Sequence, residues 1–112
     1  AHSNHYLCGP HGCEANFAQS LPDSFGRLYR MTALLRENFG RHTVESMKSI
    51  LSDHAGGPVG ICRHPHEGAD HPSIPASGRT VAALIAEPDR GRLHVARGNP
   101  CENAFETHSL AD

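Results

Sequence analysis

The sequence contains no Trp, and aromatic residues make up only 5% of its 112 residues, so we expect a modest hydrophobic core. It also has no apolar run long enough for a transmembrane helix. Ten basic and twelve acidic side chains leave a net charge near −2. This balance argues against nucleic acid or an anionic membrane surface as a partner.

The N-terminus lacks two further features. The chain starts at Ala1 rather than Met, and no basic segment is followed by an apolar run. We therefore expect a processed or truncated chain without a signal peptide. We also predict a cytoplasmic location, and reduced thiols for the four Cys residues.

Two amphipathic helices are predicted in the first half of the chain. Apolar residues recur at helical spacing from Ser24 onward, and Asn38-Phe39-Gly40 ends this stretch. The second helix begins at the N-cap residue Thr43, includes His54 in its apolar stripe and stops at Gly56-Gly57-Pro58.

The second half predicts mainly strands. Residues 80–86 are apolar, residues 92–97 alternate polar and apolar, and Pro88-Asp89-Arg90-Gly91 between them predicts a β-hairpin turn. A long polar loop is expected at residues 64–79. Short strands are also expected at residues 2–8, 59–63 and 104–110.

This order of elements predicts the α+β class, with two helices on one face of a largely antiparallel sheet. Residues 80–86 are apolar on both faces of their strand, so both faces require cover. Two helices can cover only one face. We therefore expect another sheet layer or another chain on the other.

The ten His and four Cys residues raise the question of a zinc site. One cluster near the N-terminus consists of His2, His5, Cys8, His11 and Cys13. Its spacing of three places strand residues on opposite faces, and no standard zinc-binding pair follows it. The segment Cys62-Arg63-His64-Pro65-His66 with His71 is a similar candidate, but His residues in loops usually face solvent. We predict no metal and no cofactor, with a non-catalytic zinc-binding module on the N-terminal cluster as the alternative.

Single residues suggest little catalytic chemistry by themselves. Cys62 on a predicted strand favours plain core packing over a nucleophile. The Asn4 side-chain amide is of the type that donates to a developing oxyanion, although residue type alone favours a paired polar residue. A plain scaffold domain with incidental His residues is a third interpretation.

Several short motifs nevertheless follow a familiar order. They include His2-Ser3-Asn4-His5, Leu21-Pro22-Asp23-Ser24, Gly60-Ile61-Cys62-Arg63 and Gly98-Asn99-Pro100. Over nearly the whole chain, this order resembles the C-terminal part of the acyl-coenzyme A:6-aminopenicillanic-acid acyltransferase (isopenicillin N acyltransferase) family. Its members are autoproteolytic, cysteine-dependent N-terminal-nucleophile hydrolases and transferases. The resemblance implies an αββα sandwich, with residues 1–112 as the C-terminal portion of that single domain.

The resemblance also implies the chemistry of the site. A nucleophilic Cys, freed by self-cleavage, would lie upstream of this chain and form a thioester acyl-enzyme. Asn4 matches the family's Asn whose amide stabilises the oxyanion, while Ser77 and Arg79 lie near the family's substrate-binding Ser-Arg pair. The implied partners are the remainder of the same enzyme and a small-molecule amide or acyl-CoA substrate. This chain alone is then predicted to be inactive.

Overall fold

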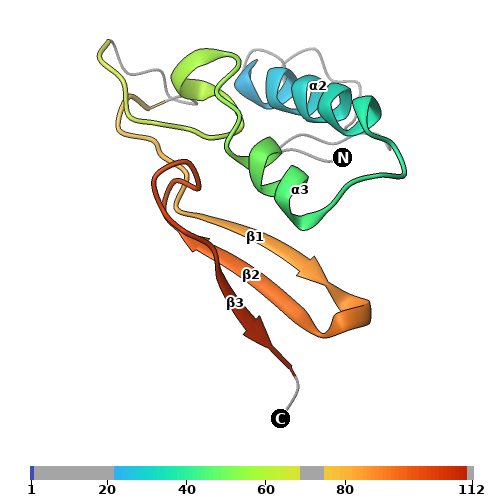
Figure 1. Ribbon diagram of the computed structural model, residues 1–112. Coiled ribbons are helices and arrows are strands. Elements are labelled where there is room, and N and C mark those ends of the chain that lie inside the picture. Colours follow the sequence, from blue (N-terminus) through green and yellow to red (C-terminus); the bar gives the residue numbers. More distant parts are fainter. Residues whose placement is uncertain (2–21, 69–74, 111–112) are drawn as a thin grey trace, which may run out of the picture.

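The computed structural model describes Ala1, residues 22–68 and residues 75–110. This part of the chain is a small α+β unit of two helices and a three-stranded antiparallel sheet (Figure 1), so the coarse fold class is confirmed. The strand expected at residues 2–8 lies outside the described residues. The described elements are α2 (Pro22–Glu37), α3 (Val44–Leu51), η1 (Gly57–Val59), β1 (Ala82–Glu87), η2 (Pro88–Arg90), β2 (Arg92–Arg97) and β3 (Glu106–Ser109).

Both helices form where the sequence predicts them. α2 begins two residues earlier than expected, because Pro is well suited to the first turn of a helix. α3 starts after Thr43, whose hydroxyl accepts a hydrogen bond from the Ser46 N–H at 3.1 Å. The Ser46 hydroxyl accepts in return from the Thr43 N–H at 2.8 Å, which completes a capping box.

The predicted strand at residues 59–63 is wrong. The chain forms the short turn η1 there and then continues without regular structure. The N–H of Cys62 donates to the Asp53 carbonyl at 3.0 Å, and the N–H of His64 donates to the Pro58 carbonyl at 2.9 Å. These local bonds replace a strand ladder, because Gly56 and Gly57 adopt left-handed conformations with φ of 92° and 66° that fold the segment back.

The sheet has the order β1-β2-β3, and the predicted hairpin is confirmed. Leu84 lies opposite Val95, and Ile85 lies opposite His94. η2 and Gly91, at φ 57°, form the turn between the two strands. β3 is shorter than predicted and pairs with β2 from Glu106 to Ser109.

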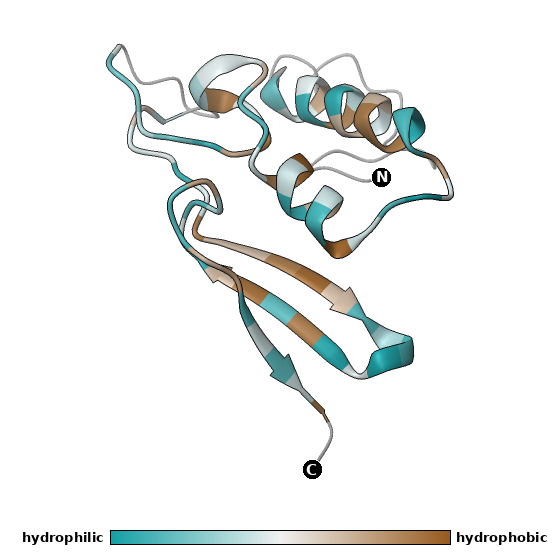
Figure 2. Cartoon of the chain, in the orientation of Figure 1, coloured by the Kyte–Doolittle hydropathy of each residue, from teal (hydrophilic) through white to brown (hydrophobic). Residues whose placement is uncertain are grey.

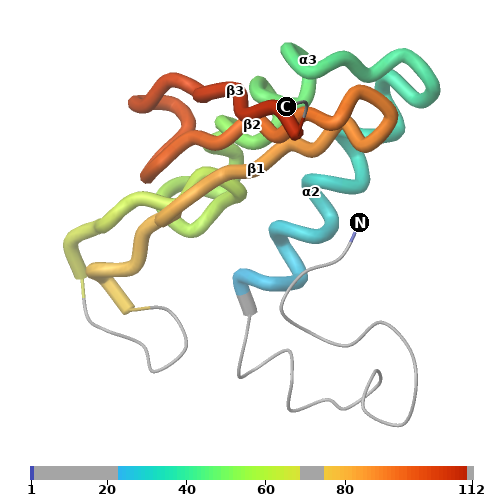
Figure 3. Tube along the Cα trace, turned by 90° about the horizontal axis from the view of Figure 1, so that it is seen from below, coloured from blue at the N-terminus to red at the C-terminus, as the bar shows by residue number. Residues whose placement is uncertain are grey.

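The two faces of the sheet differ in cover. Ala83, His94 and Ala96 are buried on the face towards α3. Figure 1 shows α2 and α3 together on one side of the sheet, and Figure 3 shows its three strands side by side. On the opposite face Leu84 is 58% exposed, and the neighbouring positions in the register are Ala86, Leu93 and Val95. Among the described residues nothing covers this apolar face, and the expected second layer remains a prediction.

The hydrophobic core of the described part is small. Only Ile50, Cys62, Ala83 and Ala96 are buried apolar residues there. Figure 2 shows hydrophobic and hydrophilic residues alternating along β2, with a largely hydrophilic β3. Within the described ranges, no helix combines the length and apolar character needed to cross a membrane.

Candidate metal centre

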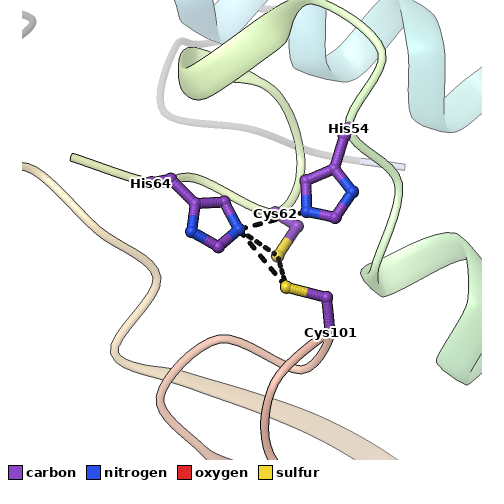
Figure 4. Close-up of side chains that lie close together, drawn as sticks. All are labelled: His54, Cys62, His64 and Cys101. Atoms are coloured by element: carbon purple, nitrogen blue, oxygen red, sulfur yellow. Dashed lines mark hydrogen bonds between the residues drawn. The ribbon is translucent and has the colours of Figure 1, made fainter. Parts of the chain in front are cut away.

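Three separate segments bring four metal-binding side chains together. His54 follows α3, Cys62 and His64 follow η1, and Cys101 lies in the turn after β2. Figure 4 shows these side chains pointing towards one another. One potential ligand atom from each residue lies within 4.8 Å of all the others.

The closest distances in this His/Cys cluster centre on His64. Its Nε2 atom lies 3.1 Å from His54 Nε2, 3.6 Å from Cys62 Sγ and 3.3 Å from Cys101 Sγ. The two sulfur atoms are 3.5 Å apart, and both thiols are free. Cys62 is completely buried, whereas Cys101 and His54 are exposed, so the cluster lies where the interior meets the surface.

Asn99 supports the cluster from inside. It is 6% exposed, and its Nδ2 atom donates to the Arg63 carbonyl at 2.6 Å. The same amide lies 3.5 Å from Cys62 Sγ, within the distance of an N–H···S hydrogen bond. Asn99 therefore ties the turn that carries Cys101 to the segment that carries Cys62 and His64.

An ion pair fixes the segment before His54. The Arg30 guanidinium of α2 binds both carboxylate oxygens of Asp53, at 2.7 and 3.0 Å. The hydrogen bond from Arg30 holds the pKa of Asp53 below its ordinary value, assisted by a hydrogen bond from the Ala55 N–H. Since the Asp53 carbonyl also accepts from the Cys62 N–H, this residue links α2 to two arms of the cluster.

Polar neighbours act on the outer side of the cluster. Glu102 Oε1 lies 3.7 Å from His64 Nδ1, the ring nitrogen that faces away from the thiols. Loss of hydration raises the pKa of the Cys101 thiol, and the hydrogen bond with Cys62 adds to this effect.

Apart from Cys62 and His64, the candidate site residues predicted from the sequence are not part of this cluster or lie outside the described residues. Asn4 and the N-terminal cluster fall outside them, as does His71. Ser77 and Arg79 are exposed on the segment that leads to β1. A side chain on Gly78 between them would come within 3.0 Å of the Arg63 guanidinium.

The sequence groups Cys62 and His64 with His66 and His71, whereas in the structure they meet His54 and Cys101; His66 is not part of the cluster, and His71 lies outside the described residues. Cys62 is buried as predicted, but its sulfur faces three other metal-binding groups rather than apolar core atoms alone. His54 follows the end of α3 instead of belonging to the apolar stripe of the helix, and the sequence assigns no role to Cys101. The sequence features that could have indicated this cluster are the turn residues Gly56-Gly57-Pro58 and Asn99-Pro100, because they reverse the chain before Cys62 and Cys101.

No protein-family model matches this chain, and no curated protein sequence matches it either.

Proposed function

We propose that this chain is the C-terminal part of a cysteine-dependent acyltransferase or amidohydrolase of the N-terminal-nucleophile class. Two observations support the proposal. The first is the order of the short motifs along the sequence. The second, which carries the structural argument, is the apolar sheet face opposite the helices.

An αββα sandwich requires a sheet with this asymmetry. Each of its two sheets is covered by helices on the outer face and packs against the other sheet on the inner face. Here the face with Ala83 and Ala96 lies under α3, while the face with Leu84 and Val95 is uncovered among the described residues. In the proposed enzyme, the upstream part supplies the second sheet and the nucleophilic Cys.

The proposed site combines residues from both parts. The upstream thiolate attacks an amide or thioester carbonyl, and the acyl group passes through an acyl-enzyme to an amine or to water. Asn4 donates its side-chain amide to the oxyanion. Ser77 and Arg79 are exposed and therefore accessible to a substrate, and the Arg79 guanidinium suits a substrate carboxylate. The proposed enzyme is cytoplasmic and acts on small molecules.

The test is acyl transfer by the whole protein with Asn4→Ala. We expect intact-mass analysis of the wild type to show two chains from self-cleavage before a Cys, and acylation of that Cys by a p-nitrophenyl ester. Loss of one oxyanion donor should lower the acylation rate by about a hundred- to a thousandfold. Asn38→Ala, in the exposed turn after α2, is the matched control and should leave the rate unchanged. An uncleaved wild-type chain that is not acylated would overturn the proposal.

A further inference from the structure

Four of the six distances within the His/Cys cluster match the edges of a tetrahedron around one zinc ion, and the other two, from His54 to the two sulfur atoms, are no longer than 4.8 Å. Zn–S bonds of about 2.3 Å and Zn–N bonds of about 2.0 Å at tetrahedral angles imply separations of about 3.8 Å for S···S, 3.3 Å for N···N and 3.5 Å for S···N. The corresponding distances here are 3.5 Å between the sulfur atoms and 3.1 Å between the two Nε2 atoms. The two mixed distances at His64 are 3.6 and 3.3 Å.

We infer that His54, Cys62, His64 and Cys101 form a structural zinc site. Two thiolates and two imidazoles in tetrahedral arrangement are the ligand set that favours zinc over harder, oxygen-preferring cations such as Mg²⁺ or Ca²⁺. Four protein ligands complete the tetrahedron and leave no position for water or substrate, so the role is structural and not catalytic.

The surroundings of the four ligands fit bound thiolates. The Asn99 amide lies 3.5 Å from Cys62 Sγ, so it can donate to a sulfur that carries negative charge in the zinc-bound state. His64 directs Nε2 into the cluster and Nδ1 towards Glu102, at 3.7 Å. This is the order of groups in a carboxylate–histidine–zinc arrangement, in which the carboxylate orients the ring.

The site would compensate for a small hydrophobic core. Its ligands come from the end of α3, the irregular segment after η1 and the turn after β2, which lie far apart in the sequence. Zinc joins these three segments where few apolar side chains hold them together. This role is independent of the proposed enzymatic function, because the nucleophile assigned there is a different Cys.

A disulfide and a Cys–His nucleophile are the competing explanations for the cluster. A disulfide between Cys62 and Cys101 requires a sulfur separation of about 2.0 Å and leaves both His residues without a role. A nucleophile must reach its substrate, but Cys62 is completely buried. Cys101 is exposed and lies 3.3 Å from His64, but a Cys101–His64 pair leaves Cys62 and His54 without a role. Neither alternative accounts for the convergence of all four groups.

The first experiment measures metal in the whole protein, purified in reducing buffer without chelator, by inductively coupled plasma mass spectrometry. We expect one zinc per chain at this site in the wild type and loss of that zinc in Cys101→Ser. The matched control is Cys13→Ser, which should retain it. Zinc that is lost in Cys13→Ser but kept in Cys101→Ser would overturn the assignment in favour of the N-terminal cluster. Wild-type protein without zinc would also overturn it.

The second experiment uses only wild-type protein and remains informative if Cys101→Ser does not fold. Iodoacetamide labelling of the native protein, once with zinc bound and once after a chelator has removed it, is followed by peptide mapping. We expect zinc to protect the exposed Cys101, and replacement by Co²⁺ to give the absorption bands of tetrahedral cobalt bound by thiolates. Equal labelling of Cys101 with and without zinc, or a Cys62–Cys101 disulfide in fresh protein, would overturn the site. Because neither readout involves acyl transfer, failure here leaves the proposed function untouched.

Discussion

At the residue scale, Asn99 is one of the few buried polar residues in the described part of the chain. A buried side-chain amide must have its hydrogen bonds satisfied, and Asn99 achieves this with the Arg63 carbonyl at 2.6 Å and the Cys62 sulfur at 3.5 Å. Its backbone carbonyl accepts from the Glu102 and Asn103 N–H groups, at 3.1 and 3.0 Å. Asn99 thereby shapes the turn that presents Cys101.

Asn99→Ala should weaken zinc binding without removing a ligand. Loss of an outer-shell partner of this kind typically lowers metal affinity by about 10- to 100-fold. Competition between the whole protein and a chromogenic zinc chelator measures the change. Asn99→Asp is expected to be worse, since its carboxylate would face a thiolate and a carbonyl. Asn38→Ala is the control, and equal affinities for Asn99→Ala and wild type would contradict this role.

At the scale of single elements, the structure depends on how η1 folds back on the segment that follows α3. Gly60 approaches the backbone of this segment so closely that a Cβ atom would lie 2.6 Å from the Ala55 carbonyl oxygen. Because the obstructing atom belongs to the backbone, it cannot rotate away. The segments carrying His54 and Cys62 are therefore held together partly by the absence of a side chain at Gly60.

Gly60→Ala should destabilise the protein, while Gly26→Ala should stabilise it. Forcing an atom into the contact at Gly60 is expected to cost about 1–3 kcal/mol. Gly26 lies inside α2, where an added Cβ atom would meet nothing within 4 Å, so Ala there should gain about 0.5–1 kcal/mol of helix stability. Chemical denaturation of the whole protein compares the two variants. A Gly60→Ala variant as stable as the wild type would show that this close approach is not needed for folding.

The elements that local sequence predicted correctly share one property: their signals lie within a few residues. The capping box at Thr43 and Ser46 and the turn with Gly91 are examples. The segment 59–63 failed for the opposite reason. Val59 and Ile61 resemble strand residues, but the glycines before them and the long-range bond from the Thr80 N–H to the Arg63 carbonyl decide their path.

At the scale of the whole molecule, the uncovered sheet face decides what the chain requires from its surroundings. Leu84 is 58% exposed at the centre of β1, next to the apolar side chains of β2. An exposed apolar strand face of this kind favours burial against another layer. The loss of stability on truncating Leu84 therefore shows whether a second layer packs on this face.

Leu84→Ala should strongly destabilise the whole protein if the upstream part covers this face. Truncating a buried Leu costs about 2–5 kcal/mol, whereas substitutions at exposed positions stay within about 0.5 kcal/mol. Phe39→Ala is the matched control, because Phe39 is 86% exposed in the turn after α2. Denaturant titration of both variants gives the comparison. Equal, small effects would mean that the face remains bare and would count against the sandwich.

The sequence by itself determined the α+β class, the two helices and the hairpin, because periodicity, caps and turns act over short distances. Only the tertiary structure decided which faces were covered and which chemical groups met. His54, Cys62 and Cys101 are eight to 47 residues apart, and no local pattern relates such positions. They converge because the Cys62 N–H binds back to the Asp53 carbonyl and because the Asn99 side chain ties the turn after β2 to the Arg63 carbonyl, two contacts that depend on the assembled chain.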